Sequence, residues 1–202
     1  MKRTFMIIDD FLPDPMALRA HAYRVQYEDH DPSNYFPGRN ARSRVPIDGL
    51  DELISRLVDE PLVPAEGTSH TKFRLALDGN VGRGGVHIDR NTWSGILYMT
   101  PDEHCQGGTD FLRHKRTDAT TVPMNEDELR ETGYPDYQSY LEGLLIPESR
   151  DYEKWEVYMH IPMKFNRLLL FRPWMFHDAG PSFGTSVDNG RLIYPLFYNP
   201  KL

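Results

Sequence analysis

Residues 86–113 read VHIDRNTWSGILYMTPDEHCQGGTDFLR, and their pattern is that of an antiparallel β-sheet. Short apolar runs at 86–89, 93–99 and 109–113 are separated by turns rich in glycine and polar residues. Runs of this length between turn signals are typical of strands, because helices need a longer periodic stretch. The segment therefore predicts three short strands joined by turns.

Further strand signals lie on both sides of this stretch. Apolar and other residues alternate at 73–77, as expected for a strand with one face on a core. The remaining predicted strands are 4–12, 167–171, the region of His177, and 191–198. Together they are enough to close a double sheet, so we expect a mainly β protein with flanking helices and a double-stranded β-helix (jelly-roll or cupin-like) core over 69–202.

Helical signals flank and interrupt these strands. Asp14 followed by Pro15 is typical of an N-cap and first helical position, which predicts a helix over about 15–25, and a second is predicted at 49–59. Both belong to an N-terminal helical support, 1–68. Helical periodicity returns at about 123–160, where Asn125 and Glu128 resemble a capping box, so we predict a helical insert there.

Length and composition favour one domain of 202 residues, with 39% hydrophobic residues and a formal net charge of −7. The negative charge disfavours nucleic acid as a partner. Neither a signal peptide nor a membrane span is expected, since the apolar runs are short. Cys105 is the single cysteine, which excludes an internal disulfide and favours a reducing, cytoplasmic location.

His87 and Asp89 are the first candidate metal ligands. In a strand, residues i and i+2 project from the same face, so an imidazole and a carboxylate would lie side by side. His177, arriving from a distant strand, would complete a set of two histidines and one carboxylate, the facial triad that suits non-haem Fe(II) and leaves positions open. A zinc cluster of His104, Cys105 and His114 is the weaker alternative, because these residues lack paired Cys-x-x-Cys spacing.

Three motifs in their order carry a family resemblance: His87-Ile88-Asp89, Gly95 to Thr100, and Gly107 to Phe111. They resemble the core of prolyl 4-hydroxylase-like enzymes, a branch of the Fe(II)/2-oxoglutarate-dependent dioxygenase superfamily. Downstream, 164–171, 176–181 and 190–193 resemble the strand before the distal histidine, the segment of that histidine, and the closing strand. The resemblance covers about 70–200.

This resemblance implies an enzyme that binds Fe(II), 2-oxoglutarate and O₂ and hydroxylates a C–H bond. It assigns His87, Asp89 and His177 to the metal, and Arg191 on the closing strand to the distal carboxylate of 2-oxoglutarate, with Tyr98 as a second contact. A guanidinium suits this role because its fork meets a carboxylate with two parallel hydrogen bonds. Arg191 follows His177 at a somewhat longer interval than is usual in the family.

The substrate is expected to be a small molecule that bears a carboxylate, such as an amino acid. The loop 35–44 concentrates positive charge, and it predicts that Arg39, Arg42 and Arg44 contact an anionic group, with Trp174 in the pocket wall. The insert is expected to form a facing wall or lid. Two other functions stay open: a cupin-type metal dioxygenase that does not use 2-oxoglutarate, and a jelly-roll module that binds without catalysis.

Overall fold

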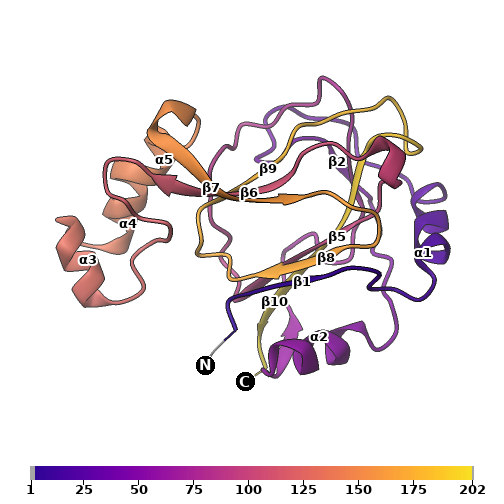
Figure 1. Cartoon of the computed structure of the whole chain (residues 1–202), viewed down its shortest axis with the longest axis horizontal. Coiled ribbons are helices and arrows are strands. Elements are labelled where there is room, and N and C mark those ends of the chain that lie inside the picture. The colour runs from indigo at the N-terminus through magenta and orange to yellow at the C-terminus, as the bar shows by residue number, and fades with distance from the viewer. Residues whose placement is uncertain (1–2, 202) are drawn as a thin grey trace.

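The computed structural model describes residues 3–201, and it contains two antiparallel sheets that face each other (Figure 1). The larger sheet has the order β1-β8-β5-β10-β4-β2, with β3 also paired to β10, and the smaller has the order β7-β6-β9. The bounds of the larger sheet are β1 (Phe5–Ile8), β2 (Arg39–Asn40), β3 (Leu62–Pro64), β4 (Arg74–Ala76), β5 (Trp93–Tyr98), β8 (Leu168–Phe171) and β10 (Arg191–Pro200). Those of the smaller are β6 (Gly108–His114), β7 (Trp155–Pro162) and β9 (His177–Ala179). The predicted jelly-roll class is confirmed.

Strand β10 runs along the middle of the larger sheet, and its alternation separates two environments. Leu192, Tyr194, Leu196 and Tyr198 are buried in the core that packs against the N-terminal helices. The intervening residues face the other sheet, because successive side chains in a strand point to opposite faces. The outer face of the larger sheet is thus a helix-covered core, and its inner face is free to line a site.

The two N-terminal helices are α1 (Pro15–Ala22) and α2 (Leu50–Val58). The side chain of Asp14 caps α1 by accepting a hydrogen bond from the Ala17 N–H at 3.0 Å, as its sequence pattern predicts. In α2, the buried residues Leu50, Ile54 and Val58 recur at every fourth position and form one apolar stripe on the sheet.

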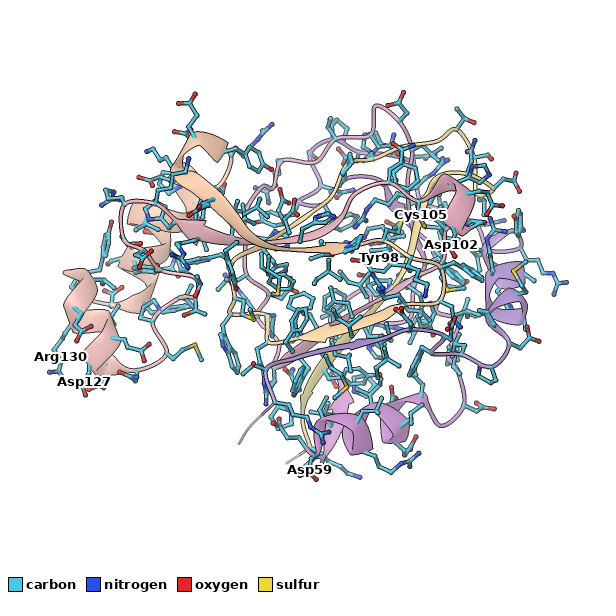
Figure 2. All side chains as sticks on the ribbon, viewed as in Figure 1. Asp59, Tyr98, Asp102, Cys105, Asp127 and Arg130 are labelled. Atoms are coloured by element: carbon cyan, nitrogen blue, oxygen red, sulfur yellow. The ribbon has the colours of Figure 1, made fainter. Side chains whose placement is uncertain are left out.

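Another apolar cluster lies between the two sheets and contains Tyr98, Phe111 and Phe171. Figure 2 shows Tyr98 in this inner layer, whereas Asp59 at the end of α2 lies at the periphery. The rings of Phe111 and Phe171 meet edge to face with centroids 5.2 Å apart, a favoured aromatic arrangement. This layer fixes the separation of the sheets beside the site.

The helical insert projects from one end of the sheets (Figure 1). It comprises α3 (Glu126–Thr132), α4 (Tyr137–Tyr140), the π-helical η2 (Leu141–Leu145), α5 (Ile146–Glu148) and η3 (Tyr152–Lys154); a short η1 (Asp102–His104) lies elsewhere, between β5 and β6. The predicted cap is confirmed, since the Glu128 N–H donates to Asn125 Oδ1 at 2.9 Å. Asp127 and Arg130 mark the outer end of the insert (Figure 2).

Three predicted segments differ clearly from the structure. The insert ends at Lys154, and the expected helix through 160 is wrong because Trp155–Pro162 is β7, paired along its length with β6. Residues 86–89 form only an isolated bridge at His87, and β1 is shorter than 4–12. Strands β2 and β3 were not expected. Among residues 3–201, no helix combines the length and apolar character needed to cross a bilayer.

Candidate metal centre and its cavity

A cavity of about 570 Å³ opens on the inner face of the larger sheet. Strands β4, β5 and β10 contribute to its wall, as do β6 and β9 of the smaller sheet. The loops 35–37, 65–69 and 84–91 also line it, together with Asn40, Lys72 and Phe171. This volume lies in the range typical of small-molecule sites.

His87, Asp89 and His177 meet in this cavity, with one potential ligand atom from each lying within 4.8 Å of the others. His87 and His177 pair as an isolated antiparallel bridge, in which each backbone N–H donates to the carbonyl of the other, at 2.9 and 3.0 Å. Asp89 Oδ2 lies 3.6 Å from His177 Nε2. The structure therefore brings together the three residues that the sequence predicts as ligands.

Hydrogen bonds fix which ring nitrogen of each histidine is free. His87 Nδ1 lies 2.7 Å from the Gly85 carbonyl, and His177 Nδ1 lies 2.8 Å from the Met175 carbonyl. Because a carbonyl oxygen only accepts, each Nδ1 carries the proton and each Nε2 presents its lone pair to the centre. This is the usual outer support of metal-binding histidines.

The surroundings also favour the protonation states that metal ligands need. Burial would raise the pKa of Asp89, but hydrogen bonding and charge from His177, with His87 and Ser94, outweigh it and lower that pKa. Burial, reinforced by His177, lowers the pKa of His87. Ser94 Oγ donates to Asp89 Oδ2 at 2.5 Å and holds the carboxylate in place. A charged carboxylate beside an imidazole that burial keeps neutral, that of His87, fits a divalent cation.

Arg191, predicted to bind 2-oxoglutarate, lines the same cavity and is only 2% exposed. Its Nη2 donates to the Gly108 carbonyl at a long 3.4 Å, and its Nε is buried without a partner. No carboxylate lies within 4.0 Å of it in the part of the chain that is described. Buried charges are ordinarily paired, so this guanidinium is available to an anionic ligand.

Tyr98, predicted as the second cosubstrate contact, is fully buried and is not part of the cavity lining. Its hydroxyl lies 2.7 Å from Thr109 Oγ1, and Thr109 does line the cavity. Tyr98 thus contacts a residue of the cavity wall without lining the cavity itself. Its direct contact with 2-oxoglutarate stays a prediction.

The four predicted substrate contacts do not line this cavity. Arg39 pairs with Leu75 across β2 and β4, on the face of the sheet that carries the helix-covered core. Arg42 and Arg44 are exposed and donate to backbone carbonyls. Trp174 packs against a buried apolar cluster that includes Leu112, Tyr140 and Trp155 and joins the insert to the smaller sheet. Their role in substrate binding stays a prediction.

Two other expectations can be compared with the geometry. Within residues 3–201, His87, Asp89 and His177 are the one group of His, Cys, Asp or Glu side chains close enough to share a metal ion, so His104, Cys105 and His114 form no zinc cluster. Residues 123–148 contribute nothing to the cavity lining. The insert is connected to the cavity wall by Tyr152, whose hydroxyl donates to Asp178, and by Ser149, whose carbonyl accepts from the Val86 N–H at 2.8 Å.

Sequence reasoning missed Ser94, Tyr35 and Arg74 as parts of the site. Ser94 follows Asp89 by five positions and faces the cavity from β5. The alternation of side chains along a strand could have predicted that it faces inward. Tyr35 meets the ring of His87 edge on, with centroids 5.5 Å apart, but no local pattern links two residues so far apart. Arg74 alternates with apolar neighbours on β4, which places it on a polar face without showing that the face lines a cavity.

Solved structures with the same fold include metal- and 2-oxoglutarate-related proteins. SnoK, a non-haem alpha-ketoglutarate-dependent carbocyclase from nogalamycin biosynthesis, matches with a TM-score of 0.58 at 13% identity, over 98% of this chain and 79% of its own. HygX from Streptomyces hygroscopicus, with nickel and 2-oxoglutarate bound, matches with a TM-score of 0.50 at 14% identity, over 100% of this chain and 84% of its own. EvdMO1 matches with a TM-score of 0.51 at 14% identity, over 100% of this chain and 48% of its own. These likenesses show the shared jelly-roll fold.

No curated protein sequence matches this chain. A family model described as a family of unknown function (DUF6445) matches residues 85–198. That range contains His87, Asp89, His177 and Arg191. It spans more than half of the chain, and the protein therefore belongs to the DUF6445 family.

Proposed function

We propose that this protein is a non-haem Fe(II)- and 2-oxoglutarate-dependent dioxygenase that hydroxylates a C–H bond of a small molecule, in the cytoplasm. The observation that carries the proposal is one cavity holding both the cluster of His87, Asp89 and His177 and the unpaired guanidinium of Arg191. The order of the motifs in 87–111 supports the prolyl 4-hydroxylase-like branch.

The donor set fits the metal. Two imidazole nitrogens and one carboxylate are the ligands that non-haem Fe(II) oxygenases use, whereas structural zinc sites are filled by four protein ligands. His87 Nε2, Asp89 and His177 Nε2 would hold the ion, with their orientations fixed by Gly85, Ser94 and Met175. The fold shared with HygX, whose structure holds nickel and 2-oxoglutarate, adds support at the level of fold.

When bound, Fe(II) and 2-oxoglutarate would supply the oxidising chemistry: O₂, 2-oxoglutarate and the substrate C–H group yield succinate, CO₂ and an alcohol. The chain itself binds, orients and excludes water. Arg191 would pair with the distal carboxylate of 2-oxoglutarate, at a site where burial strengthens the ion pair. Ile96, Phe171 and Ile193 give the same cavity an apolar wall that limits the access of water.

An anaerobic titration tests this proposal. We expect Fe(II) to bind the purified protein, and added 2-oxoglutarate to produce the weak visible charge-transfer band of a chelate. His87→Ala should bind neither, and Arg191→Gln should bind Fe(II) while needing much more 2-oxoglutarate to produce the band. His21→Ala is a matched control, because His21 is an exposed helical residue outside the cavity.

The two alternative functions predict different results in the same titration. A cupin-type dioxygenase would bind Fe(II) and show no change on adding 2-oxoglutarate. A binding module without catalysis would bind no Fe(II) at the triad. Either result would overturn the proposal.

A further inference from the structure

A second guanidinium, that of Arg74 on β4, lines the cavity together with Arg191. Its Nε donates to Asn40 Oδ1 at 2.9 Å and its Nη2 donates to Ser69 Oγ at 2.9 Å. The plane of the Phe36 ring supports it, with Arg74 Cζ only 3.6 Å from the ring centroid. Three neighbours therefore hold the guanidinium in one orientation before any ligand arrives.

All of these neighbours are neutral. In the described part of the chain, no carboxylate lies within 4.0 Å of Arg74. Burial, together with the charge of Arg191, lowers the pKa of Arg74 to about 10, so the group remains cationic at neutral pH. Arg74 and Arg191 share the cavity with Asp89 and Asp178, but neither guanidinium forms an ion pair with them. The two cations lower each other's affinity for a proton, and a carboxylate from a ligand would relieve that repulsion.

The loop that carries Phe36 also reaches the metal centre. Phe36 lies against Arg74, and the preceding residue, Tyr35, lies edge on to His87. Neighbouring residues of one loop therefore contact the Arg74 guanidinium and the metal centre, and both lie in the same cavity. Tyr35 and Phe36 both belong to the cavity wall.

The loop is held in this position by close backbone packing. The Gly84 N–H donates to the Tyr35 carbonyl at 2.8 Å, and a Cβ on Gly84 would lie 2.5 Å from that oxygen. The wall is therefore fixed by the segment that leads directly to His87. A substrate anchored beside Phe36 would meet the metal at a defined distance.

We propose that Arg74, positioned by Asn40 and Ser69, binds a carboxylate of the substrate, which is a small acid with an apolar or aromatic body lying along Tyr35 and Phe36. This inference rests on the proposed function, in which Arg191 takes the carboxylate of 2-oxoglutarate. Arg74 and Arg191 then each have their own anion. The sequence-based expectation of a carboxylate-bearing substrate is retained, with a different arginine as the anchor.

The test uses matched probes on the full-length protein loaded with Ni(II) and saturating 2-oxoglutarate. Phenylacetate, L-phenylalanine and L-leucine are compared with phenylacetamide, L-phenylalaninamide and L-leucinamide by saturation-transfer NMR and calorimetry. We expect at least one acid to bind at least tenfold more tightly than its amide. Arg74→Gln should lose that preference, and Arg74→Lys should keep part of it, because an ammonium retains the charge without the fork.

Arg113→Gln is the matched control, since it removes an arginine that lies outside the cavity and pairs with Asp118. The assignment is wrong if no acid binds, if amides bind as well as acids, or if Arg74→Gln keeps the acid preference. It is also wrong if inorganic phosphate binds where the acids do not. Because the acid and amide comparison is made on the unaltered protein, it holds even if a variant fails to fold.

The two proposals fail in distinguishable ways. If 2-oxoglutarate does not bind the Ni(II) protein, the proposed function fails. The acid titrations are then repeated with Arg191→Gln, in which Arg74 is retained and Arg191 can no longer bind the acid. If 2-oxoglutarate binding is lost in Arg74→Gln and kept in Arg191→Gln, Arg74 serves the cosubstrate and the present assignment is overturned.

Discussion

His87 and His177 hold each other by both of their backbone groups, and their ring centroids lie 4.3 Å apart. One pairing of main chains thus sets the position of two candidate ligands from distant parts of the sequence. The Nδ1 of each ring is in turn held by a carbonyl two residues earlier in its own segment. The donor arrangement is therefore built into the sheet, and binding a metal would require little reordering of these residues.

Replacing any one ligand should abolish metal binding and turnover. His87→Ala, Asp89→Ala and His177→Ala each remove one of three donors, so the affinity for Fe(II) should fall by more than the roughly 10- to 100-fold that loss of an outer-shell partner costs. Metal affinity by anaerobic titration, with His21→Ala as control, checks this. Full metal binding by one of the variants would remove that residue from the ligand set.

Ser94→Ala should weaken metal binding without removing a ligand. Its hydroxyl holds Asp89 Oδ2 at 2.5 Å, and loss of this bond frees the carboxylate to rotate away from the site. We expect a drop in metal affinity of roughly 10- to 100-fold. Ser186→Ala, outside the cavity, is the control. Equal affinities in the two variants would show that Ser94 does not position Asp89.

The candidate metal centre was predictable because its sequence signal is local and the strands around it have a regular alternation of side chains. The His-x-Asp spacing places two side chains on one side of an extended segment, and this holds although 86–89 is not a regular strand but a single bridge at His87. The spacing alone does not identify the third ligand, His177. His177 is brought in by pairing with His87, a contact between segments that only the complete sheet defines.

Arg74 was not predictable for a related reason. Its alternation with Phe73 and Leu75 resembles that of an exposed strand face, and only the loop 35–37 and the opposite sheet turn that face into a cavity wall. The error at Trp155–Pro162 was avoidable. Trp155 and Ile161 are buried at the two ends of a period-two pattern, a strand signal that follows directly on helical periodicity.

Arg191→Met should separate function from stability. The guanidinium is buried, its one hydrogen bond is long, and its Nε has no partner, so an apolar side chain of similar length removes an uncompensated charge. We expect the melting temperature of the ligand-free protein to hold or rise. Affinity for 2-oxoglutarate should fall by ~2–5 kcal/mol, since one partner of a desolvated ion pair is lost.

Thermal melts and titrations on the Ni(II) protein measure both quantities, with Arg113→Met as the control for loss of an arginine. A large fall in stability with unchanged 2-oxoglutarate affinity would mean that Arg191 is structural. The cosubstrate carboxylate would then require another cationic partner.

The last prediction concerns His70, a buried histidine that links the end of the larger sheet to α2. It is 3% exposed, its Nδ1 accepts a hydrogen bond from the Phe197 N–H at 3.0 Å, and its Nε2 lies 3.5 Å from Asp51 Oδ1. Burial lowers the pKa of His70 below its ordinary value of 6.5, with Arg44 acting in the same direction and Asp51 opposing. The neutral ring is therefore part of the folded state.

Protonation of His70 should then destabilise the protein as the pH falls. The unfolded chain binds the proton near pH 6.5 while the folded chain resists it, so the contribution of His70 is complete above that pH and is lost as the pH drops toward the lower folded-state pKa. The slope from one group is at most about 1.4 kcal/mol per pH unit. His70→Asn keeps an acceptor for the Phe197 N–H but cannot titrate, and it should lose this part of the pH dependence. Urea unfolding of both proteins between pH 7.5 and about 5 measures the difference in slope. Parallel curves for the two proteins would show that His70 is not the group that titrates.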